Sequence, residues 1–284
     1  MGSEARGASR AKGGVPVNIA KALTIAGSDS GGGAGIQADL KTFQELGVFG
    51  MSALTAVTAQ NTKEVTGIYE LPPEAVAKQI DAVVTDIGVD AAKTGMISSV
   101  PIMEIIAAKV KEHRIHHLVI DPVMISKSGA ALLKEEARHA LKRLLIPLAE
   151  VVTPNLPETE VLTGITPDTE EKRKEAARRI VEMGARSVVI KGGHLRGEKA
   201  VDLFFDGKSF EHLTAPRIET RHTHGTGCTF SAALTAELAK GRPLFDAVRK
   251  AKEYITAAIR HPLELGGGHG PVNHWAHRRE EAKG

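Results

Sequence analysis

Short runs of apolar residues alternate along the chain with segments in which apolar residues recur every three or four positions. The short runs are rich in β-branched residues, which is typical of strands that are covered on both faces. Strands are predicted at Ala22–Ala26, Met51–Thr58, Val89–Lys93, Leu118–Ile120, Val151–Thr153 and Ser187–Ile190. Because helical segments separate these runs, the pattern predicts βα units around a largely parallel sheet, that is, an α/β fold.

Helix signals occupy the intervals between the strands. Helices are predicted after Pro72-Pro73, after Ser98-Ser99, near Thr226–Lys240 and near Leu244–Arg260. Thr166, Pro167 and Asp168 have the order of a capping residue, a first-turn proline and an early acid. They therefore predict the start of another helix, which Gly184 terminates.

The remaining segments indicate a hairpin, a leader and one domain. Asp206-Gly207 separates Ala200–Phe205 from Lys208–His212, which predicts a hairpin with a type I′ turn. Residues 1–18 are small, polar and basic and lack the apolar stretch of a secretory signal, so we interpret them as a disordered leader. No internal repeat or long linker interrupts residues 19–284, and this favours a single domain.

Composition narrows the function classes. The 284 residues include 37 basic and 34 acidic ones, and the net charge of +3 provides no strong attraction to nucleic acid or acidic lipid. No apolar run approaches the ~18 residues of a membrane span, and few aromatic residues are present to stack bases. The single cysteine, Cys228, excludes an internal disulfide framework and fits a reducing compartment. These features favour a cytoplasmic globular enzyme with neither a nucleic-acid nor a membrane partner.

Polar residues follow every predicted strand at the point where the strand ends. These segments are Gly27–Gly35, Gln60-Asn61, Thr94–Met96, Asp121–Met124, Thr153–Glu158 and Lys191–His194. In an open parallel sheet, ligands bind beyond the carboxyl ends of the strands. The repetition of polar groups at corresponding positions therefore predicts a shared site rather than chance loop chemistry.

The glycine-rich run after the first strand is not a known nucleotide loop. Gly33 stands where a P-loop needs lysine, and Ile36 stands where a dinucleotide-binding fingerprint needs a small residue. Two interpretations remain, a flexible turn or a close approach of the backbone to a small ligand. On the following helix, Asp39 and Lys41 are either solvated surface residues or, for Asp39, a hydrogen-bond acceptor for a hydroxyl or amine.

A second glycine-containing segment, Thr223–Ser231, immediately precedes a helix of small residues. Glycines at such a place leave the free N–H groups of the helix accessible, and the helix dipole adds positive potential, so an anion is stabilised there. The alternative is a tightly packed helix start. Cys228 is either a small buried hydrophobic residue or a thiol whose pKa is lowered by the helix N-terminus.

Histidines carry no clear signal. His222 and His224 form a His-x-His pair, but without a third ligand or an acidic partner they do not predict a metal site. The other candidates are expected on the surface: His116, His117, His269, His274 and His277.

Six segments form a specific set when they are taken together: Ala22–Asp29, Gly32–Thr42, Ala59–Thr62, Thr153–Glu158, Lys191–His194 and Thr223–Cys228. As a set they resemble the hydroxymethylpyrimidine/phosphomethylpyrimidine kinase family of thiamine biosynthesis, within the ribokinase-like superfamily. The resemblance covers roughly residues 20 to 275. It implies a ribokinase-like three-layer α/β/α sandwich with a mostly parallel central sheet, and a homodimer.

The resemblance also implies the chemistry and its cofactors, ATP and Mg²⁺. The hydroxymethyl group of 4-amino-5-hydroxymethyl-2-methylpyrimidine becomes a phosphate ester, and the monophosphate is then converted to the diphosphate. On the pyrimidine side, the implied substrate-binding residues are Asp39, Gln60, Met96 and Val123. On the phosphate side, the implied residues for ATP and magnesium are Asp121, Asn155, Glu158 and Lys191, with Asp121 and Glu158 on the metal directly or through water. The implied catalytic residues are Gly225, Thr226, Gly227, Cys228 and Lys191. Lys191 is expected to approach the ATP phosphates as a mobile positive charge; the alternative is an ordinary surface lysine.

The resemblance leaves the role of Cys228 open, because a free thiol is largely protonated at neutral pH. The second phosphorylation starts from an ionised phosphate and needs no strong base. Cys228→Ala is therefore hypothesised to impair phosphorylation of the alcohol more than phosphorylation of the phosphate. Gly192-Gly193 and the Phe204–Phe210 hairpin are expected on the nucleotide side; the alternative, favoured for Asp206-Gly207, is an ordinary hairpin at the edge of the sheet.

Other functions compete with this one. A pyridoxine or pyridoxal kinase of the same superfamily is the nearest alternative, because it phosphorylates a similar hydroxymethyl-bearing heterocycle. A non-catalytic pyrimidine sensor is a second alternative from a different class. A dinucleotide-dependent oxidoreductase is less favoured because the glycine fingerprint fails.

Overall fold

A computed structural model describes residues 19–124, 133–193 and 197–278 of the chain. The predicted leader and His194 lie outside the described residues. Among the described residues, no helix has the length and apolar character needed to cross a membrane.

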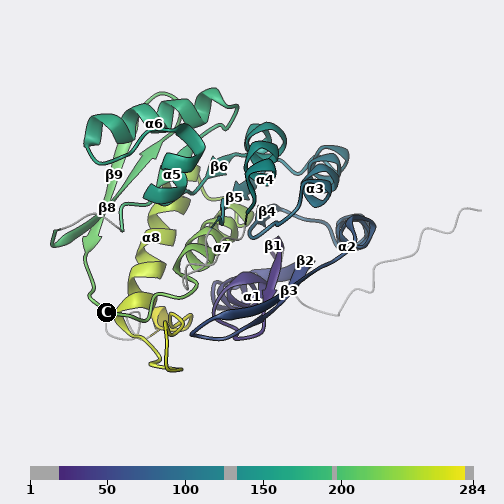
Figure 1. The fold of residues 1–284 in the computed structure, drawn as a ribbon, viewed down its shortest axis with the longest axis horizontal. Helices are drawn as coiled ribbons and strands as arrows, with labels where there is room; N and C mark the ends of the chain where they lie inside the picture. Colours follow the sequence, from purple (N-terminus) through teal and green to yellow (C-terminus); the bar gives the residue numbers. More distant parts are fainter. Residues whose placement is uncertain (1–18, 125–132, 194–196, 279–284) are drawn as a thin grey trace, which may run out of the picture.

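One sheet of nine strands runs through the described part of the molecule (Figure 1). Its order is β3-β2-β1-β4-β5-β6-β7-β8-β9, and the pairs from β2 to β7 are parallel. The strands are β1 (Lys21–Asp29), β2 (Phe49–Gln60), β3 (Val65–Glu70), β4 (Ala91–Thr94), β5 (Leu118–Ile120), β6 (Val151–Val152), β7 (Val188–Ile190), β8 (Lys199–Phe205) and β9 (Phe210–Pro216). Antiparallel β3 borders one edge and the β8–β9 hairpin the other.

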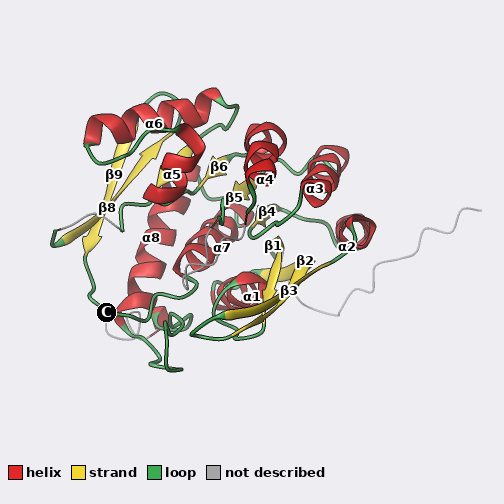
Figure 2. Cartoon of the chain, in the orientation of Figure 1, coloured by secondary structure: helices red, strands yellow, loops and turns green. Residues whose placement is uncertain are grey.

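Helices cover both faces of this sheet (Figure 2). They are α1 (Gly35–Glu45), α2 (Pro73–Asp86), α3 (Val100–Glu112), α4 (Glu135–Ala140), α5 (Leu156–Thr163), α6 (Glu170–Glu182), α7 (Thr226–Ala239) and α8 (Leu244–Arg260). A π-helical segment, Leu141–Leu145, and a 3₁₀ turn, Ile146–Leu148, extend α4. Successive strand residues point to opposite faces: Leu118 and Ile120 join the apolar core with α2, α3, α4 and α6, whereas Val119 packs with α7 and α8. This is the expected three-layer α/β/α arrangement.

The six strand predictions are confirmed, with shifted ends. β1 continues to Asp29 and β2 to Gln60, because both strands extend past the core to the rim of the sheet. β4 is displaced towards Thr94. The sequence pattern gave no sign of β3, whose residues are mostly exposed and which pairs with the outer half of β2.

Two predicted details of local structure are wrong. Helix α6 begins at Glu170, and its capping residue is Thr169, whose Oγ1 accepts a hydrogen bond from the Lys172 N–H at 3.3 Å. Thr166 instead donates a hydrogen bond to Glu160 at 2.6 Å. The β8–β9 hairpin is present, but its turn is not type I′, because that turn needs two successive residues with positive φ and only Gly207 has one.

Candidate active site

A cavity of about 470 Å³ opens at the carboxyl ends of the strands. It lies where β1 is flanked by β2 on one side and β4 on the other, so the chain order reverses there. Such a switch point is where open parallel sheets bind ligands. Every predicted strand end contributes to the lining: Gly27–Asp29, Gln60, Met96, Asp121, Asn155 and Lys191. The predicted gathering of polar strand ends at one site is therefore confirmed.

All but one of the predicted site residues line this cavity. The lining includes Gln60, Met96, Asp121, Val123, Asn155, Glu158, Lys191 and the segment from Gly225 to Cys228. Gly192, Gly193 and the β8–β9 hairpin, expected on the nucleotide side, are not among its described lining residues.

Asp39 is the exception, because its side chain lies wholly inside the protein. Its carboxylate accepts hydrogen bonds from Lys93 Nζ at 2.7 Å and from Thr24 Oγ1 at 2.6 Å. Both members of the ion pair are 0% exposed. Burial alone would lower the pKa of Lys93, but the Asp39 carboxylate more than offsets this and holds the pKa above its usual range. Asp39 is therefore the counter-ion of Lys93 and does not reach the cavity.

The N-terminus of α7 forms one end of the cavity. Gly225 caps it with a positive φ of 78°, and no side chain caps the helix. A Cβ on Gly227 would lie 3.3 Å from Lys191 Nζ and 3.5 Å from Asp121 Oδ2, so the absence of a side chain there lets these two groups approach the first turn. Free N–H groups and an ammonium thus converge, as an anion site requires.

Lys191 is held in place, whereas the sequence analysis expected a mobile charge. Its Nζ lies 3.1 Å from Asp121 Oδ1, which also accepts a hydrogen bond from Thr153. Burial opposes the charge of Lys191, but the carboxylates of Asp121 and Glu158 raise its pKa above the usual range. The ammonium is therefore a fixed positive charge at the end of β7.

Glu158 and Asn155 have a local structural role as well as a place in the cavity. They form a reciprocal capping box at the start of α5: the Asn155 N–H donates to Glu158 Oε2 at 2.8 Å, and the Glu158 N–H donates to Asn155 Oδ1 at 2.9 Å. Burial raises the pKa of Glu158 to about 7; the charge of Lys191 opposes the shift and that of Asp121 adds to it.

These residues fit a magnesium ion. Asp121 and Glu158 supply the oxygen ligands that Mg²⁺ prefers, and Mg²⁺ usually keeps several waters and needs few protein ligands. Burial and the neighbouring charge of Asp121 disfavour Glu158 as an anion, and a nearby cation would offset this effect.

Cys228 differs electrostatically from the expectation for a cysteine at a helix N-terminus. Burial raises the pKa of its thiol to about 12; Lys93 opposes this, while the carboxylates of Asp39 and Asp121 add to it. Desolvation and nearby negative charge thus outweigh the helix dipole. In the free protein Cys228 is therefore a neutral thiol, and of the two interpretations of this residue the one with a lowered pKa is wrong.

His224 and Asp29 line the cavity and were missed as site residues. Their side chains are hydrogen bonded, with 2.8 Å between His224 Nε2 and Asp29 Oδ2. In the sequence, the only sign of this pair is that each residue lies within one of the two glycine-containing segments. His274, expected on the surface, is 2% exposed and lies 3.1 Å from Thr229 Oγ1, and burial lowers its pKa to about 4. His269 is exposed as expected and borders the cavity.

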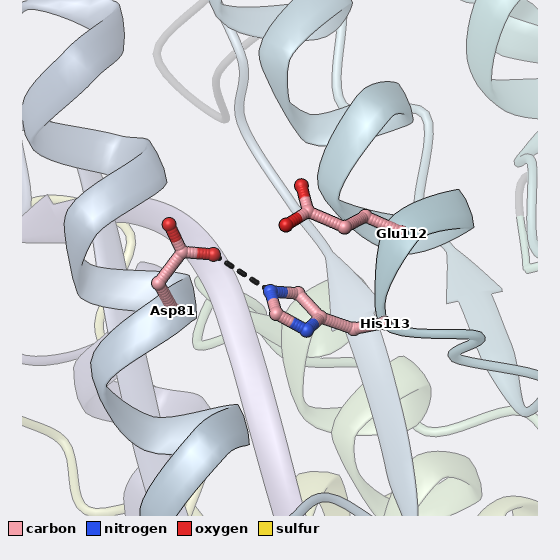
Figure 3. A group of neighbouring side chains, drawn as sticks. All are labelled: Asp81, Glu112 and His113. Carbon is pink, nitrogen blue, oxygen red and sulfur yellow. Dashed lines mark hydrogen bonds and ion pairs between the residues drawn. The ribbon is translucent and has the colours of Figure 1, made fainter.

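A second group of side chains of types that bind metals, Asp81, Glu112 and His113, lies between α2 and α3, far from the carboxyl ends of the strands (Figure 3). His113 Nε2 is 2.6 Å from Asp81. The Lys109 ammonium lies 2.8 Å from Asp81 and 2.9 Å from Glu112, so a cation of the protein already bridges the two carboxylates. We interpret this group as a surface ion-pair network rather than a metal centre.

Comparison with known proteins agrees with the geometry. The solved structure of Bacillus subtilis pyridoxal kinase in an ADP complex superposes with a TM-score of 0.86 at 48% identity, covering 92% of this chain and 99% of that one. Fold and site thus define a ribokinase-like phosphotransferase.

The family follows from the sequence relatives. The profile of the phosphomethylpyrimidine kinase family matches residues 29–273. The hydroxymethylpyrimidine/phosphomethylpyrimidine kinase of Bacillus subtilis is 53% identical over 93% of this chain and 97% of its own length. Its counterpart from Haemophilus influenzae is 54% identical over 92% and 99%. The chain belongs to the phosphomethylpyrimidine kinase family.

Proposed function

We propose that the chain uses ATP to phosphorylate 4-amino-5-hydroxymethyl-2-methylpyrimidine and then phosphorylates the monophosphate again, as an enzyme of thiamine biosynthesis. One observation carries this proposal. A single cavity is lined by an amide and two apolar side chains, Gln60, Met96 and Val123, and by a fixed ammonium beside a helix N-terminus. Family membership supports the same reaction.

The pyrimidine is proposed to bind against Gln60. The Gln60 Oε1 atom accepts a hydrogen bond from Thr58 at 3.1 Å, and this fixes the amide so that its N–H group can donate to a ring nitrogen. Met96 and Val123 are proposed to cover the faces of the ring. Asp39 is not proposed as a pyrimidine ligand, because it lies outside the cavity.

The phosphate end is proposed to hold ATP and Mg²⁺ through Asp121, Asn155, Glu158 and Lys191. Mg²⁺ would neutralise charge on the phosphates. The N–H groups of Gly225, Thr226, Gly227 and Cys228, of which that of Thr226 also donates to the Thr223 carbonyl at 3.3 Å, are proposed to stabilise the charge that grows on the transferring phosphoryl group.

Two displacements at one site account for both products. In the first, the substrate hydroxyl oxygen bonds to the γ-phosphorus, the bond between that phosphorus and ADP breaks, and the hydroxyl loses its proton. In the second, an ionised oxygen of the monophosphate bonds to the γ-phosphorus of another ATP, and the bond between that phosphorus and ADP breaks. No hydroxyl proton has to be removed in this step. Cys228 lines the cavity as a neutral thiol. We propose that its sulfur accepts the hydroxyl proton of the first step while its own S–H proton passes to a phosphate oxygen or to water.

Product analysis tests the proposal. The purified chain, Mg²⁺-ATP and the hydroxymethylpyrimidine should give the monophosphate and then the diphosphate, resolved by ion-exchange chromatography. Formation of no phosphorylated pyrimidine contradicts the proposal, and ligand binding without turnover would favour the sensor alternative.

Pyridoxal is a second candidate substrate. The solved structure with a TM-score of 0.86 is titled a pyridoxal kinase and is 48% identical to this chain. Parallel assays with pyridoxal and the pyrimidine discriminate the two, and diphosphate formation is specific to the pyrimidine pathway.

We further propose a cytoplasmic homodimer of single-domain subunits. Large apolar side chains are exposed on the β2–β3 edge, among them Val57 and its cross-strand partner Tyr69. Sedimentation equilibrium should give twice the chain mass of 30.2 kDa, and a value near the chain mass contradicts the proposal.

A further inference from the structure

Asp29 and His224 join two neighbouring loops that both line the cavity. Asp29 is the last residue of β1 and immediately precedes the glycine loop, residues 30–35. His224 belongs to the anion loop, residues 223–228, which leads into α7. Although 195 residues separate them, Asp29 Oδ2 and His224 Nε2 lie 2.8 Å apart in a buried hydrogen bond.

The Asp29 carboxylate also organises the glycine loop. It accepts hydrogen bonds from the N–H groups of Gly31 at 2.8 Å, Gly33 at 3.1 Å and Ala34 at 2.9 Å. Burial would raise the pKa of Asp29, but His224 and these N–H groups hold it below its usual range. As an anion, Asp29 accepts the hydrogen bond and the Nε2–H of His224 donates it.

Close packing leaves the two loops no freedom to slide. A Cβ on Gly33 would lie 2.5 Å from a ring carbon of His224. A Cβ on Gly225 would lie 1.7 Å from the carbonyl oxygen of Gly33. On its other side the His224 backbone pairs with the tail, through bonds to Gly270 and Val272.

The glycine loop reaches both ends of the proposed reaction. Ser30 Oγ donates to the Gln60 carbonyl at 2.8 Å and accepts from the Gln60 N–H at 2.9 Å, so the loop holds the proposed pyrimidine ligand. The backbone N–H of Gly35 also interacts with Cys228, where it opposes the rise in the pKa of the thiol. A continuous set of contacts therefore runs from Gln60 through Asp29 and His224 to the start of α7.

We propose that the Asp29–His224 pair is a positioning device that keeps the substrate oxygen aligned with the phosphoryl group held at α7. This inference rests on the proposed function. Misplacement of reacting groups by about 1 Å can cost about 100-fold in rate. Because the pair aligns both acceptors in the same way, its loss lowers kcat for both phosphorylations equally and leaves the KM values for ATP and the pyrimidine within about threefold.

Two variants that differ by one methylene test the pair. His224→Gln keeps an amide donor long enough to reach Asp29, whereas His224→Asn is too short. We expect single-turnover rates of both phosphorylations to fall by about 100-fold in H224N and by no more than about threefold in H224Q. The double variant D29N/H224N should be no slower than the slower single variant, because the two residues act through one contact.

His222→Gln is the matched control. His222 is buried in the neighbouring segment and packs against the same tail, but it has no bond to Asp29. We expect H222Q to keep kcat within twofold of the unsubstituted chain. Should H224N not fold, D29N replaces it in the comparison with H224Q.

Three results overturn the inference while the unsubstituted chain turns over normally. The first is a kcat for H224N, or for D29N in its place, within threefold of that of H224Q. The second is a loss confined to the alcohol step, which makes His224 a proton acceptor instead. The third is rate losses of D29N and H224N that multiply in the double variant. If the unsubstituted chain forms no product, the proposed function fails first.

Discussion

Removal of the Lys93 ammonium should destabilise the protein severely. Lys93 and Asp39 are 0% exposed, and their charged atoms lie 2.7 Å apart. At that separation an effective dielectric constant of ~20 gives an attraction of about 6 kcal/mol, which the cost of removing both charges from water largely offsets. Lys93→Met leaves the Asp39 carboxylate buried without its partner. We therefore expect the free energy of unfolding to fall by about 3–5 kcal/mol.

A double-mutant cycle measured by urea denaturation and far-UV circular dichroism checks this reasoning. Asp39→Leu combined with Lys93→Met removes both charges, so the double variant should be more stable than K93M alone by at least about 2 kcal/mol. Lys21→Met is the control, because the Lys21–Asp90 pair is 27% and 41% exposed and its loss should cost less than about 1 kcal/mol. A K93M effect no larger than that of K21M, or single effects that simply add, would refute the argument.

Three further predictions concern His274, Gly225 and Cys228. The folded protein protonates His274 only near pH 4, whereas the unfolded chain does so near pH 6.5, so stability should fall as pH decreases between those values. Urea titrations should show that His274→Gln removes about 3 kcal/mol of this dependence; an unchanged pH profile contradicts it. Gly225→Ala should lower kcat at least ~100-fold by its clash with Gly33, while Gly241→Ala, also at positive φ but in open space, should keep kcat. Cys228→Ala should slow the alcohol step more than the phosphate step in single-turnover assays, and equal losses refute a proton-transfer role. Alkylation of Cys228 by iodoacetamide should stay slow at pH 7, in keeping with a thiol pKa of about 12.

The central fold could be predicted from the sequence because its strands are buried on both faces. Runs such as Leu118–Ile120 must be apolar throughout, and this marks them clearly. Edge elements carry no such mark: β3 is largely exposed and depends on pairing with β2. The cap of α6 was misplaced because Thr166 and Thr169 are equally good capping residues and only the tertiary contact of Thr166 with Glu160 distinguishes them.

The site could be predicted as a set of strand ends but not as a set of contacts. Parallel strands bring their carboxyl ends together by geometry alone, so Gln60, Asp121 and Lys191 were predictable. Whether a polar side chain faces the cavity or the core depends on partners far away in the sequence. Asp39 faces Lys93, 54 residues away, and His224 faces Asp29, 195 residues away.

Beside Gln60 and His269, which line the cavity, two segments far apart in the sequence are hydrogen bonded to each other. The Gly268 N–H donates to Thr62 Oγ1 across 206 residues, and the His269 N–H donates to the Thr62 carbonyl. Such distant contacts close only after large loops have lost their conformational entropy. We therefore expect that, during refolding, catalytic competence returns no earlier than the native amplitude of the circular dichroism signal.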